Sequence, residues 1–411
     1  MHHHHHHGGS GVGKWHIGFK EGLRPHERGF DFHYGFLSGA RTYLPGKADV
    51  APIIRNGQPV TDEKEYLTDA FAREAVAFLD RSQDQPFFLY LAFNAVHGPL
   101  EATEPYLARF PNLTGTRRIH AGMVAAMDDA VGRVLTKVRA LGQEENTLIF
   151  FYSDNGGPTR QTTASNEPLR GYKGQFYEGG IRVPFLVQWK GRLPAGVVYR
   201  EMVMGFDCHA TALAAANVDV SLRAPDDLSR SERPTLDGVN LLPFLTGEKL
   251  GRPHEQRFWR AGAKHAARVG EWKLVQERGG EPELFNLKDD IGEQSDLAAK
   301  EPAKIEELQA VFADWVKGTQ PAKWIRQDGR NAEVGGKLKT GSESSIPRRR
   351  TPVAGRIAEV FRNTDTNNDG RLTREEYPQP DSFDAVDANR DGFATPEEVR
   401  AYYQNRRGTR P

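Results

Sequence analysis

The stretch Thr147-Leu-Ile-Phe-Phe-Tyr-Ser-Asp-Asn-Gly-Gly157 is a short apolar run that ends in a polar, glycine-containing turn. Two further runs of strand length have a similar composition, one over 86–94 and one over 181–189. A run that is apolar on both faces is typical of a strand covered on two sides, as in a parallel sheet. Helical patterns separate these runs, over 66–81 and 119–141. This alternation of strands and helices predicts an α/β layered fold.

Length and composition exclude several classes of protein. The 411 residues predict two or three domains at about 150 residues each. Lysine and arginine total 55, as do aspartate and glutamate, so the net charge is zero and a globally basic, nucleic-acid-binding surface is excluded. No apolar run reaches the ~18–20 residues that a membrane helix needs. The single cysteine, Cys208, rules out an intramolecular disulfide.

Changes in composition divide the chain into five parts. Residues 1–11 consist of Met, six His and Gly-Gly-Ser-Gly, which we interpret as a purification tag and linker outside the fold. We expect an α/β core over 12–248. A small α+β subdomain follows over 249–317, where short alternating segments precede an amphipathic helix. Residues 318–352 are polar and predict a linker, and 353–411 form the last part.

The last part carries two loops with the ligand spacing of an EF-hand. Residues 365–376 and 387–398 each have oxygen ligands at the required positions and a glycine at the sharp turn. Two full matches in tandem predict two Ca²⁺ sites in a compact structural pair, the alternative being two acidic turns. The predicted ligands are Asp365, Asn367, Asp369, Arg371 (through its carbonyl) and Glu376, then Asp387, Asn389, Asp391, Phe393 (through its carbonyl) and Glu398.

A second group of chemistry-bearing residues belongs to the α/β part. Lys14 and His16 are two apart on a strand-like segment, and period two places them on one face. Ligand sites in open α/β sheets collect outside the carboxyl ends of strands. Each residue alone is typical of a loop, a turn or a solvated charge. Together they predict an oxyanion site with a hard cation; the set is Lys14, His16, His97, Asp154, Asn155 and Lys173.

The order of short motifs resembles the formylglycine-dependent sulfatases, with the arylsulfatase B and N-acetylgalactosamine-sulfatase branch nearest. The resemblance covers residues 12 to about 317. It rests on Gly13-Lys-Trp-His16, Gly35-Phe-Leu-Ser-Gly39, Val96-His-Gly-Pro-Leu100, Ser153-Asp-Asn-Gly-Gly157, Leu169-Arg-Gly-Tyr-Lys173, Glu178-Gly-Gly-Ile-Arg-Val-Pro184 and Glu283-Leu-Phe-Asn286. It implies an alkaline-phosphatase-like sulfatase sandwich followed by the small α+β subdomain and the α-helical EF-hand pair.

The resemblance also implies roles for the residues that match the family's motifs. Asp154 and Asn155 would bind an active-site calcium. Lys14 and Lys173 would hold the sulfate oxygens. His16 would orient or deprotonate the formylglycine hydrate, and His97 would protonate the leaving alcohol. The implied substrate is a sulfated carbohydrate or aryl sulfate, without nucleic acid or a membrane span, and the implied location is periplasmic or secreted.

One departure from the family pattern is large. Before the Gly-Lys-Trp-His segment, family members carry a pair of metal-binding aspartates and a Cys-x-Pro-Ser/Ala-Arg motif whose cysteine becomes formylglycine. Here Cys208 is the only cysteine and has neither that proline nor that arginine after it. We therefore expect an inactive chain with exposed sheet edge and apolar surface. The alternative is a calcium- or carbohydrate-binding pseudoenzyme, and a related phosphoester hydrolase is disfavoured by Lys14, His16 and Lys173.

Overall fold

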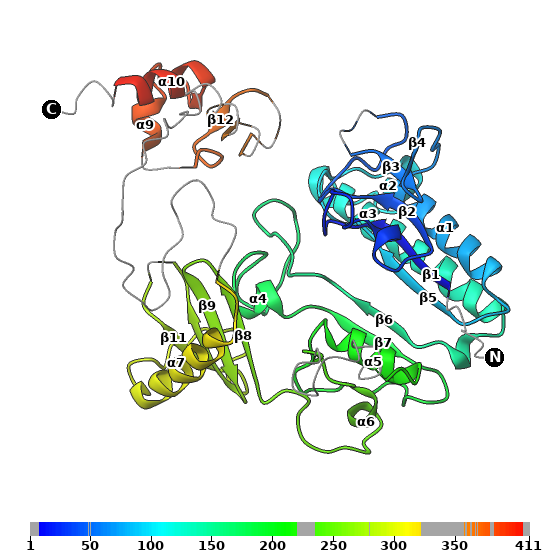
Figure 1. Cartoon of the computed structure of the whole chain (residues 1–411). Helices are drawn as coiled ribbons and strands as arrows, with labels where there is room; N and C mark the ends of the chain where they lie inside the picture. Colours follow the sequence, from blue (N-terminus) through cyan, green and yellow to red (C-terminus); the bar gives the residue numbers. More distant parts are fainter. Residues whose placement is uncertain are drawn as a thin grey trace. The chain divides into compact units, whose positions relative to one another are not determined.

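The computed structural model describes residues 8–47, 49, 51–219, 235–278, 280–321, 357, 360–361, 364–365, 367, 369–378 and 382–405. The chain divides into two compact units, residues 1–335 and 336–411 (Figure 1). The predicted tag residues 1–7 and most of the predicted linker lie outside the described residues. The finer boundaries at 248, 317 and 352 stay predictions.

The first sheet of unit one has the order β4-β3-β2-β1-β5. Its central strand β1 pairs in parallel with β2 and β5, while β2–β3 and β3–β4 pair antiparallel. The bounds are β1 Gly8–Lys14, β2 Phe32–Phe36, β3 Ile53–Arg55, β4 Gln58–Val60 and β5 Phe87–Ala92.

The strand β1 corrects one of our expectations. We placed residues 1–11 outside the fold, yet Gly8–Gly11 form the first half of the central strand. Pairing on both sides satisfies the backbone groups of this segment. Later in the same strand glycine is required by close approach, since a Cβ on Gly13 would lie 2.0 Å from the carbonyl oxygen of Ala92. A flexible-linker composition therefore does not prevent a strand where two neighbours supply hydrogen bonds.

Helices α1 (Leu67–Arg81) and α3 (Gly115–Ala140) confirm the two predicted helical segments. They pack on one another, and α1 also contacts β1, β2 and β5 (Figure 1). The short helix α2 (Glu104–Leu107) packs on α3, and 3₁₀ turns occupy Pro25–Glu27 and Glu144–Asn146. The core between sheet and helices is aromatic and aliphatic, with Tyr34, Phe36, Tyr43, Leu67, Phe71 and Met123 fully buried.

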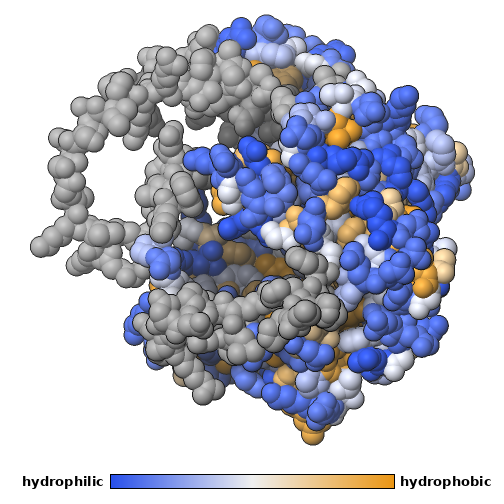
Figure 2. Space-filling view, turned by 45° about the vertical axis from the view of Figure 1, so that its right-hand side comes forward, coloured by the Kyte–Doolittle hydropathy of each residue, from blue (hydrophilic) through white to orange (hydrophobic). Residues whose placement is uncertain are grey.

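Strands β6 (Ile149–Tyr152) and β7 (Phe185–Gln188) form a separate two-stranded antiparallel sheet. The sequence predicted both segments as strands, but its expectation of covered parallel strands was wrong for this pair. Their outer side chains lack a covering layer, because Phe151, Tyr152 and Leu186 are 39%, 42% and 58% exposed. The edge strand β5 likewise exposes Phe88 and Tyr90, and in Figure 2 hydrophobic residues reach the surface between hydrophilic ones. The expected exposure of sheet edge and apolar surface is therefore observed.

The rest of unit one is a small antiparallel sheet of order β11-β10-β9-β8 with helix α7 packed on β9 and β10 (Figure 1). Its core is closed, since Ala267, Leu274, Leu284 and Leu308 are fully buried. The bounds are β8 Gln256–Ala261, β9 Lys264–Val269, β10 Trp272–Gln276, β11 Glu283–Asn286 and α7 Pro302–Lys317. Short helices precede it at α4 (Glu178–Ile181), α5 (Asp207–Ala215) and α6 (Leu242–Leu245).

In unit two, the strands β12 (Leu372–Thr373) and β13 (Phe393–Ala394) pair antiparallel, and α9 (Phe383–Val386) and α10 (Pro396–Asn405) follow one loop each. A core of its own is built from Ile357, Leu372, Tyr377, Phe383, Val386, Ala394 and Val399. Across the described part of both units, no helix has the length and apolarity to span a bilayer.

Candidate functional site

Four of the residues predicted for the oxyanion site come together at the ends of strands. Lys14 is the last residue of β1, His97 follows β5, and Asp154 follows β6. Lys173 lies in the loop before α4. The electrostatic interactions of Lys14 reach Asp154 and Lys173, and those of His97 reach all three other groups. The structure thus brings Lys14 and His97 within electrostatic range of Asp154 and Lys173.

The charges in this group favour an anionic ligand. Partial burial lowers the pKa of Lys14, Asp154 raises it and Lys173 lowers it, with a net decrease. Burial also lowers the pKa of His97, the carbonyl of Gly98 opposes this, and the two lysines lower it further. Two lysines are thus grouped with one aspartate and one histidine. A tetrahedral oxyanion would relieve the repulsion between the lysines.

His97 is held in a defined orientation. Its Nδ1 lies 2.7 Å from the carbonyl oxygen of Gly98, so this nitrogen donates and Nε2 carries the lone pair. Its backbone N–H donates to Asn94, and the hydroxyl of the buried Tyr43 donates to the carbonyl oxygens of both Asn94 and His97, at 2.6 and 2.7 Å. Tyr43 therefore holds the turn after β5 through two hydrogen bonds. The sequence did not identify this residue.

His16 lies in a different environment. Its backbone has φ of 54°, a left-handed conformation uncommon outside glycine, and its N–H donates to Leu37 at 3.1 Å. Its exposed ring packs against Gly39, where a Cβ would lie 2.7 Å from the ring. Within the described residues the ring forms no hydrogen bond or ion pair. The structure thus places His16 near β1 and the loop after β2 but outside the charged group.

A further residue, Asn166, joins the two loops that carry Asp154 and Lys173. Its side-chain amide donates to the carbonyl oxygens of Gly157 and Gly171, at 2.9 and 3.1 Å, and its oxygen accepts the N–H of Gly157 at 2.9 Å. Lys173 adds a backbone bond to Gly157. Sequence reasoning missed Asn166, although its place between the Asp-Asn-Gly-Gly and Leu-Arg-Gly-Tyr-Lys motifs was a usable signal.

Glycines allow these loops to stack backbone on backbone. The N–H of Gly156 donates to Gly180, and that of Gly179 donates to Arg170. A Cβ on Gly156 would lie 1.7 Å from the carbonyl oxygen of Gly179, and one on Gly179 would lie 2.4 Å from that of Gly171. Backbone atoms cannot move aside as a flexible side chain can. Gly156 and Gly179 are therefore required by close packing.

Asp154 and Asn155 supply only part of a calcium site. Ca²⁺ takes about six to eight oxygen ligands. The Asp154 side chain is exposed, and the Asn155 amide donates to the carbonyl oxygen of Gly156 at 2.9 Å. Among the described residues no cluster of three His, Cys, Asp or Glu side chains fits a metal ion. In the described part of the chain, the two predicted ligands do not make a complete calcium site.

The two EF-hand loops fit calcium better. In the first, Asp365 accepts backbone hydrogens from Asp369 and Gly370, and Glu376 accepts the N–H of Thr373. In the second, Asp387 and Glu398 make the equivalent bonds. The strands β12 and β13 join the loops through Leu372 and Ala394. Both loops thus carry oxygen side chains around a glycine, which matches the ligand preference of Ca²⁺.

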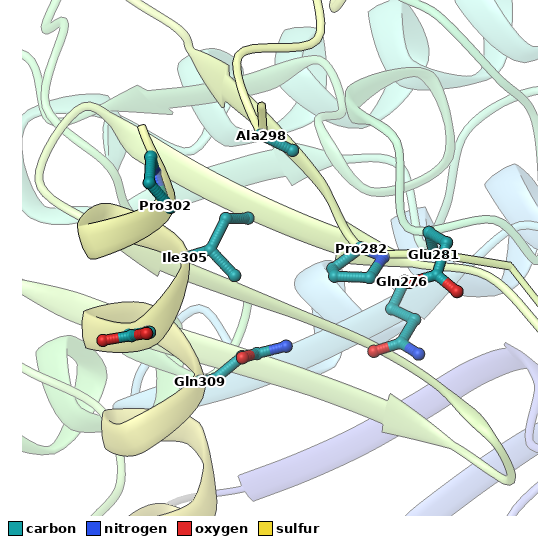
Figure 3. A pocket seen from close by; sticks show the side chains of 8 residues that line it. Gln276, Glu281, Pro282, Ala298, Pro302, Ile305 and Gln309 are labelled. Atoms are coloured by element: carbon teal, nitrogen blue, oxygen red, sulfur yellow. The ribbon is translucent and has the colours of Figure 1, made fainter. Parts of the chain in front are cut away.

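Two other features lie apart from the charged group. An open cavity of about 580 Å³ lies beside α7 in the C-terminal sheet region, and Figure 3 shows its polar and apolar lining. None of its residues was predicted to be functional; they are Gln276, Glu281, Pro282, Ala298, Pro302, Ile305, Glu306 and Gln309. The other is Cys208, which is half-buried on α5. Burial still raises the pKa of its thiol to about 11, which disfavours a thiolate nucleophile.

Comparison with known proteins gives matches for both units of the chain. A family model described as Sulfatase matches residues 9–218, and one described as EF hand matches 357–377 and 381–401. The chain is 30% identical over 343 residues to the uncharacterized sulfatase YdeN of Escherichia coli, covering 73% of this chain and 58% of that protein. It is 33% identical over 279 residues to human N-acetylgalactosamine-6-sulfatase, covering 64% and 50%.

A solved structure supports the same relationship. The crystal structure of Ps i-CgsB in complex with k-i-k-neocarrahexaose is similar with a TM-score of 0.70 and 33% identity, over 78% of this chain and 73% of that one. The predicted alkaline-phosphatase-like sulfatase fold is confirmed by such neighbours. The chain spans only about half to three fifths of the length of the curated relatives cited above.

Proposed function

The chain belongs to the sulfatase family, and on that premise we propose that its first unit holds the sulfate group of a sulfate ester between Lys14 and Lys173, with His97 beside them. The carrying observation is the electrostatic coupling of these three residues and Asp154 at the ends of β1, β5 and β6. We propose sulfuric ester hydrolysis as the activity of a protein that carries this unit together with a nucleophile.

The chain's own residues support binding and proton transfer. Lys14 and Lys173 neutralise the sulfate oxygens as ammonium groups in a partly desolvated site. A bound sulfate cancels the positive field that lowers the pKa of His97, so binding favours the imidazolium. Because Nδ1 is held by Gly98, the proton would be carried at Nε2, where it can pass to a leaving oxygen.

The nucleophilic step has no counterpart in this chain. In the family a formylglycine supplies the attacking hydroxyl, but the only cysteine here is Cys208, on an α-helix and with a raised pKa. Asp154 and Asn155 likewise supply only part of the ligand set for the calcium ion that the family uses. We therefore propose that this chain binds sulfate esters without turning them over. The alternative is a pseudoenzyme. In that case the complete protein would also lack the nucleophile and would only bind calcium or carbohydrate.

The substrate class is proposed from the relatives. One is named for action on N-acetylgalactosamine 6-sulfate groups, and one solved neighbour was crystallised with a neocarrahexaose. A sulfated carbohydrate is therefore the proposed substrate. The EF-hand match and loop geometry support Ca²⁺ binding by the second unit. Calcium availability and the family favour a periplasmic or secreted protein.

Calorimetric titration with sodium sulfate tests this function, with 4-nitrophenyl sulfate as the ester for a turnover assay. We expect sulfate binding that weakens about tenfold or more in Lys173→Met and Lys14→Met, because each loses a charge-assisted contact. Lys190→Met is the matched control, since Lys190 pairs with Glu144 at the surface. Titrations in Ca²⁺ and in a chelator separate the contribution of the metal.

Either of two results would contradict the proposal. Sulfate affinity unchanged in both lysine variants would show that the charged group does not hold the anion. If the unaltered chain releases 4-nitrophenol faster than buffer alone does, a nucleophile is present and the proposed lack of turnover is wrong.

A further inference from the structure

The loop around Lys173 is attached to the C-terminal sheet on both sides of that lysine. Before it, the guanidinium of Arg170 donates to the carbonyl oxygen of Glu293 at 3.1 Å and to the carboxylate of Glu283 at 3.3 Å. The same guanidinium stacks over the ring of Tyr177 at 4.0 Å. Glu283 begins β11, so the loop is pinned to the far edge of that sheet.

Directly after Lys173, a second cation from the sheet holds the backbone. The ammonium of Lys264, the first residue of β9, donates to the carbonyl oxygen of Gly174. The same group lies 5.3 Å from the ring centre of Phe176. The residue next to Lys173 is therefore fixed by a side chain 90 positions away in sequence.

The third attachment is a buried ionic cluster. The ammonium of Lys273 on β10 lies 3.0 Å from a carboxylate oxygen of Glu178 and 2.8 Å from one of Glu293. The side chains of Lys273 and Glu293 are fully buried and that of Glu178 is 4% exposed. Glu293 also accepts the backbone N–H of Glu178 at 2.6 Å, at the first residue of α4.

Burying these charges costs free energy of desolvation, which argues that the cluster has a specific role. Glu293 has a left-handed backbone, with φ of 51°. Burial raises its pKa, although Lys273 opposes the rise. Burial also opposes the ionisation of Glu178, but Lys273 and Arg268 outweigh it and lower its pKa. Apolar residues of similar volume would often stabilise such a position equally well, whereas an ionic cluster fixes one geometry.

We propose that Lys264 and Lys273 are positioning residues for Lys173, so that the C-terminal sheet sets the sulfate affinity of a site whose lysines it does not contain. This inference rests on the proposed sulfate-binding function. The three attachments flank Lys173 at positions 170, 174 and 178, and all of their partners come from residues 264–293. Removing one attachment leaves Lys173 and the bonds of its loop to Gly157 and Asn166 in place but lets the loop move more, so more order must be imposed when the anion binds.

Calorimetry with sodium sulfate on the full chain tests the proposal. Lys264→Ala and Lys273→Met are each expected to weaken sulfate binding about tenfold, the effect typical of losing a residue that orients a ligand-binding group. Lys264→Arg should restore most of the affinity, because a guanidinium can reach the same carbonyl. Lys288→Ala, an exposed lysine after β11, is the matched control and should bind as the unaltered chain does.

The outcomes separate the proposal from the function on which it rests. Lys264→Ala binding sulfate within about twofold of the unaltered chain, while Lys173→Met loses binding, overturns the positioning role alone. If Lys173→Met keeps full affinity, both the site and the inference fall. Should Lys273→Met fail to fold by circular dichroism, the Lys264 pair decides. A lower melting temperature with unchanged sulfate affinity in Lys264→Ala would mean a purely structural contact and would also overturn the proposal.

Discussion

The strands β5, β6 and β7 and the C-terminal sheet bury their side chains very differently. The sequence of β6 is Ile-Phe-Phe-Tyr, yet Phe151 and Tyr152 are 39% and 42% exposed. The sequence of β9 is Lys-His-Ala-Ala-Arg-Val, yet Ala266 and Ala267 are fully buried. The more apolar strand is thus the more exposed one. A strand's composition states what it could bury, and only a covering layer such as α7 makes it do so.

The same contrast runs through the candidate site. Lys14 ends the buried central strand β1, whereas His97 and Asp154 follow β5 and β6, whose outer side chains are partly exposed. The loop of Lys173 is attached to the C-terminal sheet by buried charges. Groups that follow partly exposed strands are thereby combined with a firmly held loop. This arrangement predicts that the C-terminal sheet is the more stable element of the unit.

The largest test of this contrast compares two leucines on strands. Leu274→Ala on β10 removes a fully buried side chain and is expected to lower the free energy of unfolding by about 2–5 kcal/mol. Leu186→Ala on β7 removes one that is 58% exposed and should cost less than about 1 kcal/mol. Urea unfolding followed by circular dichroism measures both. Equal losses would show that β7 is covered in solution and would break the comparison.

A somewhat smaller effect should appear with pH. Burial lowers the pKa of His33 on β2 from 6.5 to about 4, with His26 adding to the decrease. The unfolded chain therefore takes up this proton first as pH falls, so stability is present above pH 6.5 and is lost between about 6.5 and 4. The loss is at most ~3 kcal/mol.

Urea unfolding at several pH values measures this loss, and His33→Phe should flatten the curve. The control is His265→Phe on β9, a buried histidine whose pKa is also lowered by burial and whose ring stacks on Phe312 at 4.1 Å. If the His265 variant removes more of the pH dependence than the His33 variant, the acid-sensitive element is the C-terminal sheet and our placement of it is wrong.

The smallest effect on stability should come with a clear change in surface properties. Phe88→Ser combined with Phe151→Ser removes two exposed rings from β5 and β6. We expect weaker binding of an apolar fluorescent dye, with the free energy of unfolding changed by about 1 kcal/mol or less. Leu250→Ser is the control, because that side chain is 87% exposed and lies outside β5 and β6. Dye fluorescence equal in the double variant and the control would mean that the two strands form no apolar surface.

The sequence predicted elements with local signals well. The helix α1 shows its period of burial in Phe71, Ala75 and Phe78, all buried in the structure. The EF-hand loops were found because their ligands and glycine lie within twelve consecutive residues. The residues of the predicted oxyanion site were proposed from short motifs, with Lys14, His97 and Asp154 at strand ends and Lys173 in a glycine-rich loop. These features depend on spacing within one segment, which a sequence displays directly.

The missed features depend on pairs far apart in the chain. Lys273 and Glu178 are separated by 95 positions, and Glu293 and Glu178 by 115. Nothing in the local pattern of β10 marks Lys273 as buried. The antiparallel pairing of β6 with β7 likewise depends on which strands lie beside them, not on their own residues. The strand at Gly8–Gly11 was missed because backbone pairing, which needs no side chain, is what holds it.

The composition of β1 affects how firmly its register in the sheet is fixed. β1 lies at the centre of the first sheet, but four of its seven residues are glycine. A strand of this kind carries few side chains that distinguish one alignment with its neighbours from an alignment shifted along the chain. Only Val12 and Lys14 among its larger residues penalise such a slip, and Val12 is the one that is fully buried. The register of β1, the central strand of this sheet, is therefore set mainly by the side chains of neighbouring elements and only weakly by its own.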